Sequence, residues 1–135
     1  MADSHVTITG NLTDDPEVTF TPSGQAVCHF RLAVTPRVRD GETWRDGDTS
    51  FFRITAWRQL AEHVGDSLAK GDRLIVVGQL RMRAWEAPEG DKRSVVEVTA
   101  EEVGPSLRWA TAKPERATKA NGGKQAGQFN DDPPF

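Results

Sequence analysis

The chain has 135 residues, 36% of them hydrophobic and 27% charged, with a formal net charge of -3. This length suits one small domain with a tail, and the absence of any apolar run near the roughly 18 residues of a membrane span argues against a membrane protein. One cysteine excludes an internal disulfide framework, and three dispersed histidines give no metal-ligand spacing, so we expect no metal and no cofactor. The chain begins without a charged-then-apolar signal, which predicts a cytosolic protein.

Three stretches near the start of the chain alternate as strands do: residues 5–12, 17–20 and 26–34. The third stretch places Cys28, Phe30 and Leu32 on one apolar side, with His29 and Arg31 on the other. We expect Cys28 to be a buried, inert thiol, since free cysteine is usually buried. Pairing of two Cys28 residues across a subunit interface stays open as the alternative.

Residues 37–48 are polar and are predicted to form a long loop. Arg37, Arg39 and Trp44 lie in it, together with two glycines that permit tight turns. A loop of this length inside a small domain is usually functional or mobile.

The stretch 50–57 is the strand around which the other elements are arranged. Phe52, Ile54 and Ala56 fall on a side that can line a core. The opposite side carries two aromatic rings and a cation, at Phe51, Arg53 and Trp57. Such a side either packs on another layer or binds something flat.

The period changes after Trp57. Leu60, Val64 and Leu68 recur at helical spacing, and Gly71 is predicted to close a short helix. Gly65 lies inside it at a cost of about 1 kcal/mol relative to alanine.

Two further strands are predicted over 73–83, bent at Gly78, and over 93–103, with 84–92 as the tip of the hairpin between them. Val98, Ala100 and one of Val95 and Val96 are the expected inward residues of the second strand. Beyond a break at Gly104-Pro105, residues 106–111 are predicted to add one more strand. Leu107 and Trp109 would then share one face, where they could close over a neighbouring subunit.

The composition changes near residue 113. The remaining residues are mostly Gly, Gln, Asn, Ala, Pro and Lys, which cannot bury enough surface to offset the entropy of ordering. We therefore predict a folded domain over 1–112 and a disordered tail over 113–135. Antiparallel strands with one helix after the third predict an all-β, five-stranded Greek-key barrel of the OB type.

Aromatic rings and arginines alternate along these strands. Arg53, Arg58, Arg81 and Arg83 neighbour the rings of Phe51, Trp57 and Trp85. Single-stranded nucleic acid is bound by this combination, because bases stack on rings while cations follow the phosphates. The alternative is that the rings are core or subunit contacts, above all Trp57, which adjoins the helix. Trp109 has only Arg108 beside it, and we expect it to pack.

The charge of the folded part argues the other way. Residues 1–112 hold 13 basic and 17 acidic residues, a net charge of -4. Nucleic-acid-binding domains are often strongly basic, so binding would depend on local placement of the arginines. An OB-type adaptor that binds proteins and touches nucleic acid weakly is the rival hypothesis. No catalytic motif stands out, and Asp14, Asp15, Asp46 and Asp48 lie in turns that favour aspartate for backbone reasons, so we predict no enzyme.

Blocks of the chain, in order, resemble the bacterial single-stranded DNA-binding proteins, most closely the actinobacterial branch. The resemblance covers residues 5–110 and the last five residues. The matching blocks are GNLTDDPE at 10–17, the strand over 26–33, 52–54 with 57–62, GQLRMRAW at 78–85 and DDPPF at 131–135. The short tail suggests a specialised second copy.

The resemblance implies an OB-fold homotetramer that coats single-stranded DNA without sequence preference, near the nucleoid, in DNA replication, recombination and repair. By position, the resemblance implies that Phe51, Trp57 and Trp85 stack on bases. The chain departs from the family at Val38 and Phe51, where Trp is common, and this departure would weaken stacking. The residues expected to contact DNA are Phe51, Trp57, Trp85, Trp44, Arg37, Arg39, Arg53, Lys70, Arg81 and Arg83. The residues expected to bind partner proteins are Asp131, Asp132, Pro133, Pro134 and Phe135.

Overall fold

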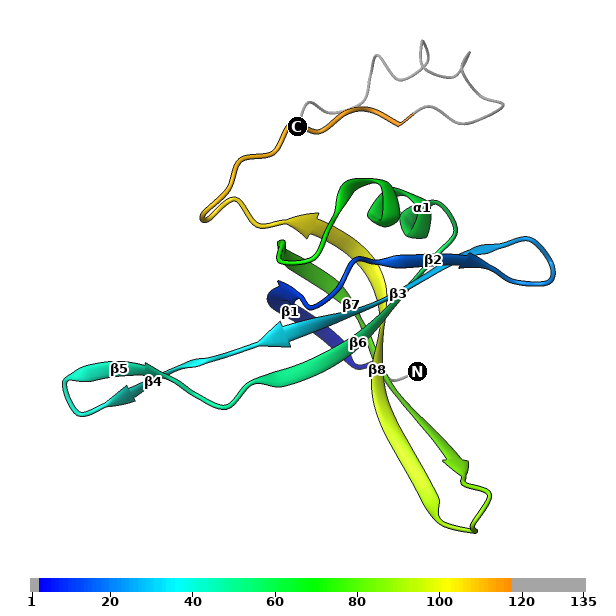
Figure 1. Ribbon diagram of the computed structural model, residues 1–135, viewed down its shortest axis with the longest axis horizontal. Helices are drawn as coiled ribbons and strands as arrows, with labels where there is room; N and C mark the ends of the chain where they lie inside the picture. The colour runs from blue at the N-terminus through cyan, green and yellow to red at the C-terminus, as the bar shows by residue number, and fades with distance from the viewer. Residues whose placement is uncertain (1–2, 118–135) are drawn as a thin grey trace.

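The computed structural model describes residues 3–117 (Figure 1). The predicted disorder and the partner-binding end of the chain fall on residues 118–135, outside the described part, while residues 113–117 are in neither helix nor strand. The elements are β1 (His5–Leu12), β2 (Glu17–Phe20), β3 (Ala26–Val34), β4 (Arg37–Asp40), β5 (Thr43–Asp46), β6 (Ser50–Trp57), α1 (Arg58–Ser67), β7 (Arg73–Glu86) and β8 (Lys92–Pro105).

Five strands close into a barrel. They are hydrogen-bonded in the order β1-β7-β8-β6-β3, and β3 returns to β1 through the pairs Asn11–Ala33 and Leu12–Leu32. Strand β6 runs parallel to β8 and antiparallel to β3, and β2 extends the sheet beside β3. This topology confirms the predicted five-stranded barrel with one short helix.

Alternating residues of these strands fill the barrel. The largest fully buried side chains are Leu32, Ile54, Leu74, Val76, Val98 and Cys28. Burial, with a smaller contribution from the negative charge of Glu17, raises the pKa of the Cys28 thiol to about 11. The thiol is therefore protonated at neutral pH and inaccessible in the folded chain, as predicted.

Helix α1 is shorter than the sequence suggests. It ends at Ser67, because Leu68 is already extended while its N–H still bonds the carbonyl of Val64 at 3.1 Å. Gly71 does not close the helix; it has φ +93° in the turn that leads to β7. Gly65 lies against β2, where a Cβ would come 2.4 Å from Cγ2 of Val18, so close packing offsets its low helix propensity. Among residues 3–117, no helix is long and apolar enough to cross a membrane.

The predicted loop over 37–48 is instead a two-stranded hairpin. Strands β4 and β5 pair from Arg37–Asp46 to Asp40–Thr43, and Gly41, with φ +68°, lies in the turn between them. Ion pairs join Arg37 to Asp46 at 3.7 Å and Arg45 to Asp40 at 3.6 Å. The prediction was wrong because both strands are mostly exposed and polar, so no alternating apolar face marks them in the sequence.

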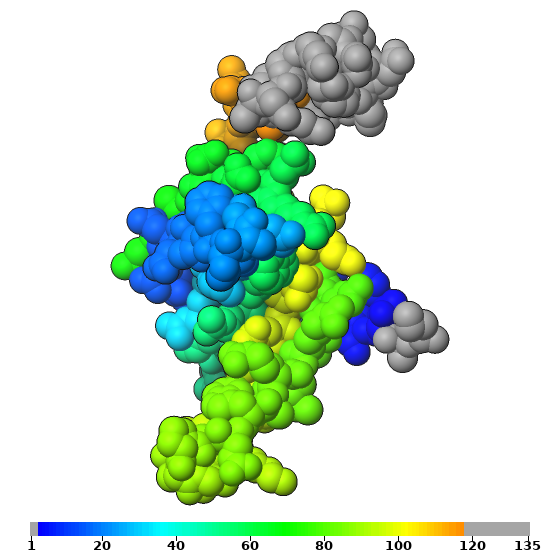
Figure 2. All heavy atoms as spheres, turned by 90° about the vertical axis from the view of Figure 1, so that its right-hand side faces the viewer, coloured from blue at the N-terminus to red at the C-terminus, as the bar shows by residue number. Residues whose placement is uncertain are grey.

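The β7–β8 hairpin is also longer than predicted. The strands pair as far as Glu86 and Lys92, which leaves only 87–91 as the tip, and β8 continues through the expected break to Pro105. Figure 2 shows this hairpin as an arm that projects from the barrel. Val98 and Ala100 are buried as predicted, whereas Val96 is exposed because it lies on the projecting part. Residues 106–111 do not form a strand, and Leu107 is exposed.

Gly78 permits the bend that the sequence predicts in β7. The β7–β8 register shifts between Val77 and Gly78, which marks a bulge. A Cβ at Gly78 would lie 2.2 Å from the backbone oxygen of Thr99, and backbone cannot move aside as a flexible side chain can. The bulge therefore depends on glycine.

We expect Gly78→Ala to lower the free energy of unfolding by about 1–3 kcal/mol, the usual cost of overpacking a close contact. Gly104→Ala is the matched control, because nothing lies within 4 Å of a Cβ there and its φ is not in the left-handed region; its change should stay within about 0.5 kcal/mol. Urea unfolding followed by tryptophan fluorescence measures both, and equal midpoints for the two variants would contradict the prediction.

Candidate nucleic-acid interface

The outward side chains of β3, β6, β8 and β7 form one surface, called here the outer face. Register places them in rows across the four strands. One row runs from Arg31 through Arg53 and Glu97 to Arg81. The next row runs from His29 through Thr55, which is buried, and Thr99 to Gln79. The first row thus carries one arginine on each of β3, β6 and β7, and the only carboxylate in it lies on β8.

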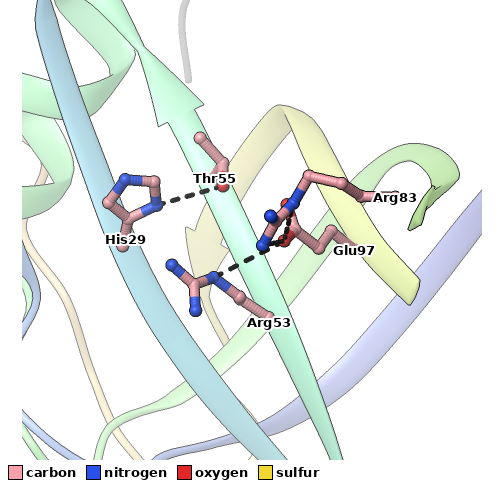
Figure 3. Close-up of polar contacts among 5 residues, drawn as sticks. All are labelled: His29, Arg53, Thr55, Arg83 and Glu97. Atoms are coloured by element: carbon pink, nitrogen blue, oxygen red, sulfur yellow. Dashed lines mark hydrogen bonds and ion pairs between the residues drawn. The ribbon is translucent and has the colours of Figure 1, made fainter. Parts of the chain in front are cut away.

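Glu97 organises these arginines (Figure 3). Its Oε1 accepts hydrogen bonds from Nε and Nη2 of Arg83, at 3.2 and 3.0 Å, and lies 3.8 Å from Nε of Arg53. The Glu97 side chain is only 20% exposed, while the two arginines are about half exposed. One carboxylate therefore joins cations from two strands that are separated by β8.

Three aromatic rings accompany the arginines. Phe51 is 57% exposed, Trp57 41% and Trp85 42%. The Arg31 guanidinium lies 4.9 Å from the centre of the Phe51 ring, and that of Arg83 lies 4.9 Å from the Trp85 ring. Half-exposed rings beside guanidinium groups can stack on flat aromatic ligands while the cations meet negative charge.

The β4–β5 hairpin carries a separate group of the predicted residues. Trp44 is exposed, and the guanidinium of Arg39 lies 5.7 Å from its ring. Figure 1 shows this hairpin projecting from the barrel as a second arm, away from the tip of the β7–β8 hairpin. The structure thus separates Arg37, Arg39 and Trp44 from the outer face.

Comparison with known proteins agrees with this geometry. The profile of the single-strand binding protein family matches residues 3–106. The chain belongs to this family. A protein of Mycobacterium tuberculosis strain H37Rv named single-stranded DNA-binding protein is 52% identical to this chain over 122 residues, which are 89% of this chain and 74% of the relative. A protein of the same name from Mycolicibacterium smegmatis is 51% identical over 120 residues, which are 87% of this chain and 73% of the relative.

A solved structure shows the same fold. The crystal structure of a small single-stranded DNA-binding protein from Streptomyces coelicolor superposes with a TM-score of 0.70 at 36% identity, over 79% of this chain and 97% of that one. These relatives are actinobacterial, which confirms the branch of the single-strand binding protein family expected from sequence.

One further member of the predicted set, Lys70, also lies away from the outer face. Lys70 lies in the turn between α1 and β7, where its backbone N–H bonds Oδ1 of Asp15 at 2.8 Å. This turn is at the opposite end of β7 from Trp85, so the structure does not bring Lys70 to the tip of the arm. The bond also gives Asp15 the backbone role expected of it, because its carboxylate holds this turn.

The residue set predicted from sequence omitted three members of the outer face. Arg31 contacts the Phe51 ring, Glu97 joins Arg53 to Arg83, and Nδ1 of His29 lies 3.2 Å from Oγ1 of Thr55. The alternation over 26–34 already placed His29 and Arg31 on the outward side, and this was the available signal. No such signal marked Glu97, because an acidic residue is not expected on a surface predicted to bind DNA.

Trp109 lies at the surface of the described chain and packs against two arginines, and its expected contact with a neighbouring subunit stays a prediction. It is 73% exposed, and its ring lies 4.7 Å from the Arg73 guanidinium and 5.1 Å from that of Arg108. Arg73 is far away in sequence, so the second cation of this cluster was not foreseen. Across residues 3–117 no three His, Cys, Asp or Glu side chains gather as a metal site would require.

Proposed function

We propose that the chain binds single-stranded DNA without sequence preference, as a non-catalytic coating protein, through its outer face. The observation that carries the proposal is that Phe51 and Trp85 are each half exposed and each adjoined by an arginine, in a chain of the single-strand binding protein family. Each stacked base contributes about 1–3 kcal/mol, and stacking tolerates any sequence because every base has a π-face.

Local charge supports binding despite the acidic total. The row across the outer face has three arginines, Arg31, Arg53 and Arg81, against the single carboxylate of Glu97. Many acidic residues lie instead in turns and on α1, such as Asp14, Glu62 and Asp66. Phosphates that meet the row release counterions, so binding should weaken as salt rises.

Oligo-dT should quench the tryptophan fluorescence of the full chain strongly at low salt and less at high salt, because rings stack on bases and arginines meet phosphates. A fluorescence titration at two salt concentrations measures this, with duplex DNA of the same length as control. Absence of quenching by oligo-dT at low salt would refute the proposal.

Trp85→Ala should weaken oligo-dT binding by about 5- to 150-fold, the equivalent of one lost stacking contact. Trp109→Ala removes the same side chain outside the outer face and should leave affinity close to that of the wild type. Anisotropy of a labelled oligonucleotide measures both without relying on tryptophan. Unchanged affinity in Trp85→Ala would favour the adaptor hypothesis, which the net charge of -4 over residues 1–112 supports.

We further infer that the end of the chain recruits replication, recombination and repair proteins. Asp131, Asp132, Pro133, Pro134 and Phe135 lie outside the described residues, and the inference stands on their chemistry. Two carboxylates, a stiff Pro-Pro and a terminal Phe suit an apolar pocket with a basic rim.

Deleting residues 131–135, or substituting Phe135→Ala, should abolish retention of such proteins from a bacterial lysate while oligo-dT affinity stays within about twofold, because the outer face is intact. Mass spectrometry of material retained by the immobilised full chain and by both variants makes the comparison. The same proteins retained by all three would contradict the inference.

Self-association into a tetramer is the remaining part of the proposal. Strand β1 pairs β7 along its length but meets β3 only at Asn11 and Leu12, so from His5 to Thr9 one edge has no strand beside it among the described residues. Such an edge can pair with a second copy. Sedimentation equilibrium should give about four times the 14.9 kDa of the chain, and a value of one chain would refute the tetramer.

A further inference from the structure

We propose that Glu97 is an internal competitor for DNA phosphate: in the free protein its carboxylate occupies the arginines that must meet the DNA, and it thereby limits affinity. The inference rests on the proposed function and names a residue that controls it. It also explains why an acidic side chain lies in the middle of the outer face.

The Glu97 carboxylate occupies the position beside Arg83 and Arg53 that a DNA phosphate would take. A guanidinium binds a phosphate or a carboxylate through two parallel N–H groups, and Arg83 already presents Nε and Nη2 to Oε1 of Glu97. Arg53 reaches the same oxygen from the other side at 3.8 Å. An incoming phosphate must therefore displace one carboxylate oxygen to engage either arginine by this edge.

The ion pairs of Glu97 with Arg53 and Arg83 are accessible enough for a DNA phosphate to displace the carboxylate. Both arginines are half exposed, so solvent and DNA can reach them, and half-exposed ion pairs are weak enough to exchange. Arg83 also lies over the Trp85 ring, so the carboxylate holds a cation beside a ring that we expect to stack on a base. The backbone register that keeps Glu97 between β6 and β7 is unaffected when its side chain releases the arginines.

The charge balance of the row gives the consequence. With Glu97 ionised, one negative charge offsets one of the cations around it. Arg53 and Arg83 contact it directly, and Arg31 and Arg81 share its row. Neutralising Glu97 should therefore let the outer face bind one more phosphate, and binding should release correspondingly more counterions. By limiting affinity, Glu97 thus allows the protein to release DNA. Without this carboxylate, the arginines would hold DNA more tightly.

Glu97→Gln tests the proposal, because glutamine keeps the shape and one acceptor oxygen but removes the charge. We expect oligo-dT affinity to rise about tenfold at low salt, and the salt slope to steepen by about 0.7, the value of one single-strand phosphate. The gain should shrink as salt rises. Anisotropy titrations of the full chain over a range of salt concentrations measure affinity and slope together.

Glu102→Gln is the matched control. Glu102 lies on the same strand, is exposed and makes no ion pair with any residue in the described range 3–117, so its removal changes net charge equally without freeing an arginine. A double-mutant cycle with Arg83→Gln supplies the second measurement: in that background the gain from Glu97→Gln should fall, since one displaced cation is already gone. Thermal melting of each variant verifies folding.

The outcomes are distinct. If the wild type itself does not bind oligo-dT, the proposed function falls and this inference with it. If the wild type binds and Glu97→Gln binds more weakly, the carboxylate positions the arginines for DNA and the inference alone is overturned. A gain equal to that of Glu102→Gln, or an undiminished gain in the Arg83→Gln background, overturns it as well.

Discussion

The register of β6 is the constraint on which both core and interface depend. Ile54 pairs with Phe30 of β3 and Val98 of β8, which fixes the fully buried layer of the barrel. The same register places Arg53 between Arg31 and Glu97 on the other side. Because strand side chains alternate, a slip of one residue would expose Ile54 and bury Arg53. The burial of Ile54 therefore stabilises the arrangement of the charged row without contacting it.

The fold was largely predictable because its strands alternate strongly. The stretches 26–34 and 50–57 each bury one side in a shared core, so their patterns reveal strand and face together. The β4–β5 hairpin and the outer part of β7–β8 were missed or shortened for the opposite reason. Both segments project from the barrel and have no core to face. The charged β4–β5 hairpin therefore shows no alternating apolar pattern, and Val96 is exposed although it is apolar.

The candidate site was predictable in its side chains but not in their partners. The alternation placed Phe51, Arg53 and Trp57 outward, and the structure keeps all three at the surface. Which cation adjoins which ring is decided by pairing between strands distant in sequence, as with Arg31 over Phe51 and Arg73 over Trp109. A single sequence does not state these pairings. Lys70 and Trp44 show the converse, since residue type alone did not bring them to the outer face.

The acidic total of the folded part and the proposed DNA-binding surface are compatible because electrostatic attraction depends on distance. At ordinary salt, exposed charges more than about 8–10 Å apart are largely screened from one another. Carboxylates in distant turns then contribute little at the outer face, whereas Glu97, 3.0 Å from Arg83 and only 20% exposed, is screened much less. The relevant quantity is the local balance on the outer face, where Arg31, Arg53, Arg81 and Arg83 lie around the single carboxylate of Glu97. On such a face one carboxylate can control affinity more than the remaining net charge of the chain.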